Sequence, residues 1–325
     1  MSDYAFYLER VRQASALTSK LEAALATAPS NAALRLNLSS AHKMMERAEA
    51  ELQSIAKIEQ VDLFKYRIVN AAAESYLLQP VTASLGLFQD VFSYIYDALI
   101  SGPKQRARLS RGVSDETAMQ FGYSFAGSLG VVLIAPSSMS LFGGKFEPSV
   151  QALFDLFEVS DDDEVKDAAK ILGRAAIQKI YQWSEVNFRA GYDLDLSWVA
   201  SSDRFRGRYI DANQFAHIAD IIGRTSEIET RPINIRGVLV GINTVLRSFH
   251  FVEPEGESFK GILADEFPAN IEWIVNQRYI ADIEEEVVIR YATGDETRRY
   301  RLLRLQSLKE VQLPEPPAPP SPPPP

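Results

Sequence analysis

The stretch IRGVLVGINTV, residues 235–245, decides the fold of the C-terminal part of this chain. It is almost entirely apolar or small and rich in β-branched residues, which is typical of a buried strand. Four more predicted strands follow it, at 247–253, 259–264, 278–291 and 298–305. Helical spacing over 268–276 places a helix between the third and the fourth strand. Because this is the element order of an OB-type barrel, we predict a small five-stranded OB-like β-barrel over residues 229–308.

The N-terminal sixty residues carry the spacing of helices rather than of strands. Apolar side chains of a first helix recur between Tyr4 and Leu25, and Pro29 then ends the pattern, with Ser30 or Asn31 as the next N-cap. A heptad seam follows, formed by Leu34, Leu38, Ala41, Met45, Ala48, Leu52 and Ile55. Two such helices joined by a short break predict an antiparallel, coiled-coil-like hairpin over residues 1–60.

The hairpin has two possible roles that the sequence leaves open. It could mediate oligomerisation or bind a protein partner through Leu34, Leu38, Met45, Leu52 and Ile55. It could equally pack on the chain's own body, because helical hairpins within one domain obey the same packing rules.

The segment 61–228 mixes both kinds of pattern. Strands are predicted near 61–68, 131–134 and 194–198, and helices near 87–100, 149–157, 163–190 and 213–222. Ser160 is the expected capping residue of the long third helix, and the acids after it suit the positive end of a helix dipole. We therefore predict an α+β domain here.

The C-terminal residues 309–325 differ from the rest of the chain in their proline content. Nine of the last twelve residues are proline, which predicts an extended, disordered tail. The whole chain is thus expected to be an α+β multidomain protein made of the hairpin, the α+β domain, the small barrel and this tail.

Composition narrows the chemistry that the chain can perform. It has no cysteine, which excludes disulfides and thiolate chemistry, and three histidines, which argue against a multi-histidine metal site. The net charge of −9 argues against non-specific coating of nucleic acid. No cofactor or metal is expected. The polar N-terminus and the shortness of the apolar run 129–135 predict a cytoplasmic protein without a membrane partner.

One near-match to a catalytic motif occurs. Gly122-Tyr-Ser124-Phe-Ala126 differs from the nucleophile elbow in its last glycine. An elbow must follow a strand and open a helix, whereas polar residues precede Ser124 and a strand pattern follows it. A serine hydrolase is therefore the weakest of our functional hypotheses.

Basic and aromatic residues suggest an alternative partner. Lys104, Arg106, Arg108 and Arg111 form a cationic loop, and Arg247, Phe249 and Phe251 share a predicted barrel strand. Arginines can hold phosphates and aromatic faces can stack bases, so a nucleic-acid- or nucleotide-sensing module is the second hypothesis. Phe249 and Phe251 have the same strand parity, however, and we favour a place for both in the barrel core.

No motif specifies an enzyme. We therefore expect a non-enzymatic, cytoplasmic interaction or adaptor protein. It would self-associate or dock a protein partner through its N-terminal helices and present the small barrel for further binding.

Overall fold

A computed structural model describes residues 3–69, 76–106, 108–125, 129–136, 144–268 and 272–308. The predicted Pro-rich tail, 309–325, lies outside the described residues. The chain is a mixed α and β protein with two sheets, and it divides into two compact units. Unit 1 consists of Met1–Thr225 and Arg290–Gly294, and unit 2 consists of Ser226–Ile289 and Asp295–Pro325. The short return segment 290–294 is therefore part of unit 1, although it lies late in the sequence.

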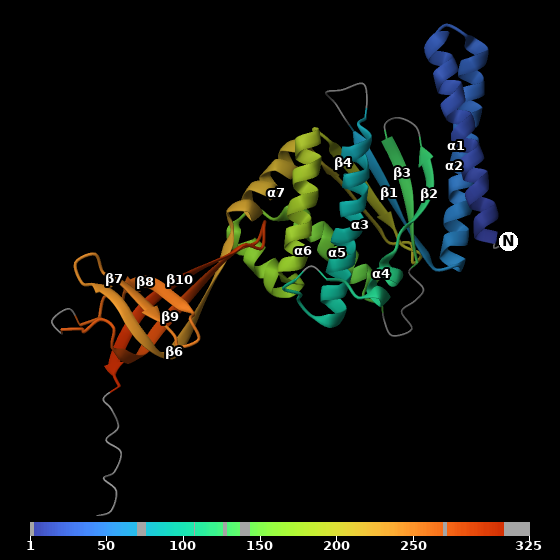
Figure 1. Cartoon of the computed structure of the whole chain (residues 1–325). Coiled ribbons are helices and arrows are strands. Elements are labelled where there is room, and N and C mark those ends of the chain that lie inside the picture. Colours follow the sequence, from blue (N-terminus) through green and yellow to red (C-terminus); the bar gives the residue numbers. More distant parts are fainter. Residues whose placement is uncertain are drawn as a thin grey trace, which may run out of the picture. The chain divides into compact units, whose positions relative to one another are not determined.

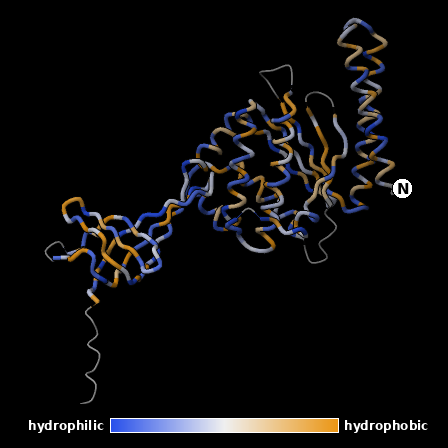
Figure 2. Tube along the Cα trace, viewed as in Figure 1, coloured by the Kyte–Doolittle hydropathy of each residue, from blue (hydrophilic) through white to orange (hydrophobic). Residues whose placement is uncertain are grey.

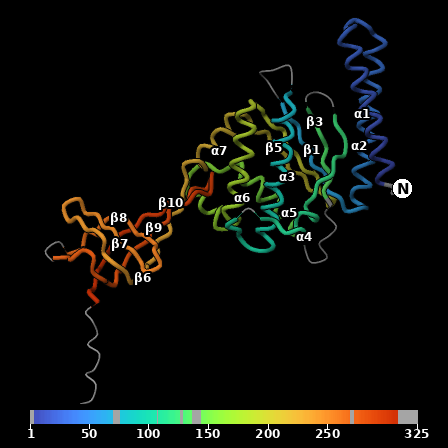
Figure 3. Tube along the Cα trace, viewed as in Figure 1, coloured from blue at the N-terminus to red at the C-terminus, as the bar shows by residue number. Residues whose placement is uncertain are grey.

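Unit 1 is built on a five-stranded antiparallel sheet. Its strands are β1 (Val61–Val69), β2 (Gln120–Phe125), β3 (Leu129–Pro136), β4 (Asp193–Val199) and β5 (Phe205–Ile210). Their order across the sheet is β2-β3-β1-β4-β5, so β2 and β5 are the edges (Figures 1 and 3). β1 lies in the middle because it pairs with both β3 and β4.

One face of this sheet is covered by helices. They are α3 (Leu78–Ser101), α5 (Phe146–Asp155) with the 3₁₀ turn η1 (Leu156–Glu158), α6 (Asp162–Ala190) and α7 (Ala212–Arg224); the short α4 (Arg111–Thr117) packs on α3. Alternate residues of the central strands, such as Tyr66 and Trp198, point into this layer and are fully buried. Figure 2 shows hydrophobic residues along these strands and on α3.

A buried polar network ties the helical layer to the sheet. The Trp183 indole N–H donates to the Tyr66 hydroxyl at 3.0 Å, and this hydroxyl lies 2.7 Å from that of Ser84. Ser84 in turn donates to the Asn187 side-chain oxygen at 2.6 Å. Because each buried polar group has a partner, the network fixes the register of α3 and α6 on β1.

The other face of the sheet carries the helical hairpin, formed by α1 (Asp3–Thr27) and α2 (Ala32–Ile58). The predicted helical pair is confirmed, and Asn31 caps α2 by accepting from the backbone N–H groups of Ala33 and Leu34. Val11 and Leu52 pack with Tyr123 and Val132 of the sheet in one cluster. Of the two roles left open, the structure shows the hairpin packed on the chain's own body.

Unit 2 is a five-stranded barrel. Its strands are β6 (Ser226–Asn243), β7 (Ser248–Val252), β8 (Ser258–Leu263), β9 (Arg278–Arg290) and β10 (Glu296–Ser307). The sheet closes in the order β10-β8-β7-β6-β9, and β8 and β10 run parallel. The two strands approach closely at Gly261, where a β-carbon would overlap the carbonyl of Tyr300.

Two local predictions are wrong. Pro268 and residues 272–277 do not form the helix predicted over 268–276, whose residues 269–271 lie outside the described part. The Tyr279 hydroxyl accepts from the N–H of Ile274 and donates to its carbonyl, both at 3.1 Å, so it replaces helical partners. The N-cap of α6 is Asp161 rather than Ser160, because the Asp161 carboxylate accepts from the N–H groups of Asp163 and Glu164.

Candidate functional site

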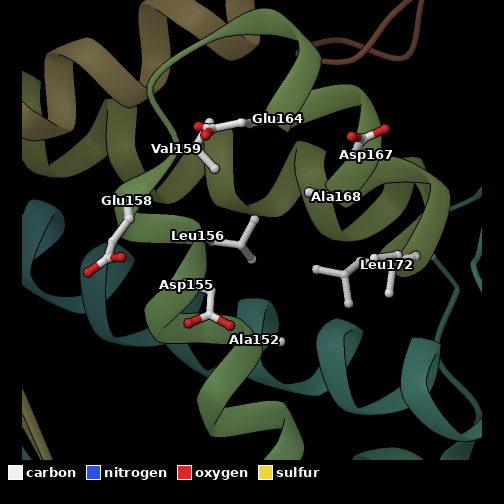
Figure 4. Close-up of a pocket in the computed structure, with 10 residues that line it drawn as sticks. Ala152, Asp155, Leu156, Glu158, Val159, Glu164, Asp167, Ala168 and Leu172 are labelled. Atoms are coloured by element: carbon white, nitrogen blue, oxygen red, sulfur yellow. The ribbon is translucent and has the colours of Figure 1, made fainter.

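Unit 1 contains a hollow of about 420 Å³ between α5, η1 and the first three turns of α6. This volume lies within the range of ligand-binding pockets. The lining residues are Ala152, Asp155, Leu156, Glu158, Val159, Glu164, Asp167, Ala168, Ile171 and Leu172. We call this hollow the acidic groove (Figure 4).

The floor of the acidic groove is apolar. Figure 4 shows Leu156 and Leu172 pointing toward each other from opposite sides. Ile171 and Leu172 follow Ala168 by three and by four residues, which puts each of them beside Ala168 on the surface of α6. Leu172 is buried, whereas Ile171 is 61% exposed. Ile171 is therefore a large apolar side chain that α6 presents to solvent at the groove.

Four carboxylates surround this floor, and each is held by a neighbouring side chain. Asp155 accepts a hydrogen bond from the Gln151 amide, and Glu158 pairs with Arg208. Glu164 accepts from the backbone N–H of Ser160 at 2.7 Å and from its hydroxyl at 3.1 Å. Asp167 pairs with Lys170 at 2.7 Å.

The charge of this rim is only partly balanced. Two of the four carboxylates have cationic partners, and neither cation lines the hollow. The helix dipole accounts for Glu164, which lies in the first turn of α6. It does not account for Asp155, the last residue of α5, because that end of a helix favours cations. Within α5, the acid is therefore accounted for only by its i,i+4 hydrogen bond from Gln151.

A second hollow, of about 370 Å³, continues the groove toward the edge of the sheet. It shares Asp155 and Glu158 with the first hollow and is otherwise lined by Phe154 and by residues 205–208 of β5, so Arg206 and Arg208 place cations in this continuation. A third, of about 360 Å³, lies at the β4–β5 turn beside Trp198. Its buried Asp62 accepts from the Trp198 indole at 3.0 Å and from the Ser201 N–H at 2.9 Å. These bonds explain Asp62 as a structural residue.

The residues predicted to mediate association lie together on one face of α2. Leu52 is fully buried in the cluster between the hairpin and the sheet, and Met45 packs against that cluster. Leu34, Leu38 and Ile55 are partly buried. The face is thus occupied within the chain, because α1 and the sheet cover it.

The cationic loop is divided between a structural and an exposed part. The Lys104 ammonium lies 3.8 Å from the buried carboxylate of Asp97, so this lysine compensates an internal charge. Arg106 and Arg108 are exposed, and Arg111 is exposed with its guanidinium 3.9 Å from Asp115. The three arginines remain accessible cations.

The barrel residues proposed for nucleic acid do not form a stacking surface. Phe249 and Phe251 are buried in the core of unit 2, so neither ring can receive a base. Their equal parity along β7 sends both side chains inward. Arg247 has a positive φ of 51° and donates to the carbonyl of Ala264, which makes it part of the turn before β7.

Ser124 does not lie on a nucleophile elbow. It is within β2, and the next described element is strand β3 rather than a helix. Its carbonyl accepts a hydrogen bond from the Ser15 hydroxyl at 2.6 Å. Within the described part of the chain, no cluster of three or more His, Asp or Glu side chains could hold a metal ion. None of the described helices combines the length and the apolar character that crossing a membrane requires.

The acidic groove does not follow from the residue pattern. Residue spacing predicts α5 and α6, and the start of a helix is sufficient to explain the acids near residue 164. Ile171 is the residue that could have indicated a binding site, because it is a large apolar side chain that stays exposed although its neighbour Leu172 is buried. An exposed Ile171 marks a groove only because α5 packs beside α6, and residue spacing does not predict that packing.

Comparison with protein-family models, with curated proteins and with solved structures finds no match for this chain. Any assignment of function therefore depends on the residues themselves.

Proposed function

We propose that this chain is a non-enzymatic interaction protein that binds a segment of a partner protein in the acidic groove. The observation that carries the proposal is the combination of an exposed apolar residue, Ile171, with a rim of four carboxylates, of which Asp155 and Glu164 have no cationic partner among the described residues. A complementary segment places an apolar side chain against Leu156 and Leu172 and a Lys or Arg beside Asp155 or Glu164.

The occupant is a protein segment because of the shape and charge of the site. The groove is open and elongated rather than closed around a small ligand, since the second hollow continues it past Asp155 and Glu158. A phosphate-bearing ligand is disfavoured because carboxylates repel anions. The N-terminal hairpin contributes no residue to this surface, so docking does not require the hairpin to leave the sheet.

The test uses a displayed library of random linear peptides, selected against the intact protein. We expect enrichment of sequences in which an apolar residue neighbours Lys or Arg. A labelled peptide from this pool should then bind about tenfold or more weakly to Ile171→Ser, because the burial of an Ile side chain contributes at least 1.5 kcal/mol. Asp155→Asn combined with Glu164→Gln should weaken binding and flatten its salt dependence.

The matched control is Asp163→Asn. Asp163 also carries a negative charge in the first turn of α6, and it pairs with Lys166 at 2.8 Å, but it does not line the groove. This variant should bind the peptide as the unmodified chain does. Selection without any basic consensus, or equal effects of the control and the groove variants, contradicts the proposal.

We also propose that the barrel of unit 2 is of the OB type. Numbered within the unit, its strands follow the cyclic order 1-2-3-5-4, and the third and fifth strands pair in parallel. These two features support an OB-type topology and an additional binding role for the barrel.

Nucleic acid is a second candidate partner because Arg106, Arg108 and Arg111 are exposed. Labelled single-stranded DNA and RNA should then bind with an affinity that falls as salt rises, and replacement of all three arginines by alanine should reduce that slope. Absence of binding at low salt excludes this candidate without affecting the peptide-binding proposal.

A further inference from the structure

The two edge strands of the unit 1 sheet differ in whether another element covers their outward backbone groups. At the β2 edge, α1 covers the backbone: the Arg12 guanidinium donates to the carbonyl of Gly122 at 2.8 Å, and the Ser15 hydroxyl donates to that of Ser124. β5 pairs with β4 on one side, and no described strand pairs with its other side (Figure 3). An open edge is a template for another strand.

The hydrogen-bond phase identifies which residues of β5 face outward. The N–H of Ala200 donates to the carbonyl of Arg204 at 2.8 Å, just before β5 begins. Because bonded and non-bonded pairs alternate in an antiparallel ladder, Arg206 and Arg208 bond to β4. The backbone groups of Phe205, Gly207 and Tyr209 therefore point away from the sheet. No described backbone group bonds to them.

The side chains of the same residues are also exposed. Phe205 is 67% and Tyr209 54% exposed, on the sheet face opposite the helical layer. The Tyr209 hydroxyl donates to Asp193 at 2.6 Å, which fixes the position of its ring. Gly207 lies between the two aromatic residues. The sequence Phe-x-Gly-x-Tyr is thus a short, open strand with an aromatic residue on each side of a glycine.

We infer that β5 pairs antiparallel with β5 of a second copy of this chain, around a twofold axis at Gly207. In that register Phe205 lies opposite Tyr209 of the second copy, and Gly207 lies opposite Gly207 of the second copy. Each of these pairs exchanges two backbone hydrogen bonds, which satisfies all the outward groups of residues 205, 207 and 209. The aromatic residues form cross-strand pairs, and the two sheets become continuous.

The same register determines which charges meet on the opposite face. Arg208 pairs with Glu158, and Arg204 pairs with Glu147, whereas Arg206 has no acidic partner in the described part of the chain. Pairing brings Arg206 beside Arg208 of the second copy, which holds a carboxylate with it. Arg206 thus lies opposite a like charge that only this carboxylate offsets, so the backbone bonds and the aromatic pairs carry the stability of the dimer.

Light scattering on the intact chain tests the pairing directly. We expect twice the mass of one chain, and a single-chain mass for Gly207→Pro. The outward N–H of Gly207 makes no bond to β4, so proline removes a bond to the second copy without removing one within the sheet. Gly207→Ala keeps that N–H and should remain a dimer. A single-chain mass of the unmodified protein, or a dimer of a folded Gly207→Pro variant, overturns the inference.

Disulfide trapping tests the register, since the chain has no cysteine of its own. Phe205→Cys and Tyr209→Cys should cross-link when mixed, because bonded pairs place Cα atoms about 5.5 Å apart, within disulfide range. Either variant alone should not, because its own copies are about 13 Å apart along the strand. His217→Cys, exposed on α7, is the matched control. If Phe205→Cys cross-links with Phe205→Cys, or Tyr209→Cys with Tyr209→Cys, the proposed register is overturned.

The dimer and the groove fail independently. Ile171→Ser should leave the dimer mass unchanged, because Ile171 lies on α6 and not on β5.

Discussion

Single residues set the shape of α6, and Gly173 is the clearest case. Its φ of 79° interrupts the helix, and a β-carbon there would overlap the backbone of Lys104. The carbonyl of Lys104 accepts the N–H of Ala175 at 3.1 Å, in place of a helical partner. The loop after α3 is thus docked on a kink that glycine makes possible.

Gly173→Ala should lower the free energy of unfolding by about 2 kcal/mol or more, because both the backbone and the space oppose a side chain. Chemical denaturation measures this loss. Gly86→Ala is the control: Gly86 is exposed within α3 with nothing near its missing β-carbon. It should stabilise the chain by about 0.5–1 kcal/mol. Equal effects of the two substitutions would contradict the role of the kink.

Tyr123 links stability to alkaline pH. Burial raises the pKa of Tyr123, and the nearby Glu49 carboxylate, which accepts from its hydroxyl at 2.9 Å, raises it further. The folded pKa therefore exceeds the unfolded value of 10.0. The associated stability is present below pH 10 and is lost as pH rises from there toward the folded pKa.

Urea unfolding between pH 9 and pH 11 checks this linkage. Tyr123→Phe should remove up to about 1.4 kcal/mol per pH unit from the fall in stability above pH 10, since one proton is involved. The variant should lose some stability at pH 8, because Glu49 then lacks one donor. An unchanged slope above pH 10 would show that Tyr123 ionises normally.

At the scale of elements, the hairpin depends on its contact with the sheet. Leu52→Ala should cost about 2–5 kcal/mol, because it opens a cavity between α2 and the strands. Leu36 is on the same helix but 70% exposed, so Leu36→Ala should change stability by less than about 0.5 kcal/mol. Hydrogen exchange in α1 and α2 would show whether the loss is local to the hairpin.

The helices and strands also show which parts of the fold residue patterns can predict. Alternating apolar residues identified the strands near 247–253 and 278–291, and the heptad seam identified α2, because each pattern is local. The heptad seam of α2 does not predict which part of the molecule packs against it. The helix over 268–276 was wrong because the hydroxyl of Tyr279, a residue outside the segment, satisfies Ile274. The acidic groove and the open β5 edge depend on helix packing and strand order, which are long-range properties.

At the scale of the whole molecule, unit 1 is completed from a distant part of the sequence. Tyr291 is buried in its core, and the carbonyl of Thr293 accepts from the Gln178 amide at 3.0 Å. The N–H of Tyr291 is bonded to the carbonyl of Thr225 at 3.4 Å. The return segment 290–294 is therefore structural and not a loose turn between two strands.

Tyr291→Ala should destabilise unit 1 by about 3–5 kcal/mol, the range for removing a large buried aromatic ring. Hydrogen exchange in α6 and α7 should rise in this variant. Val245→Ala, at an 89% exposed turn residue, is the control and should leave exchange unchanged. Equal exchange in α6 for both variants would show that the return segment does not support unit 1.

The return segment also has a consequence for biosynthesis. Residues 1–225 leave the ribosome long before Tyr291 does, so the nascent unit 1 lacks part of its core while unit 2 is being translated. Its apolar site for Tyr291 stays open during that interval, which is the state in which chaperones bind exposed hydrophobic surface. Unit 1 of this chain can therefore reach its final fold only after residue 294 has been synthesised.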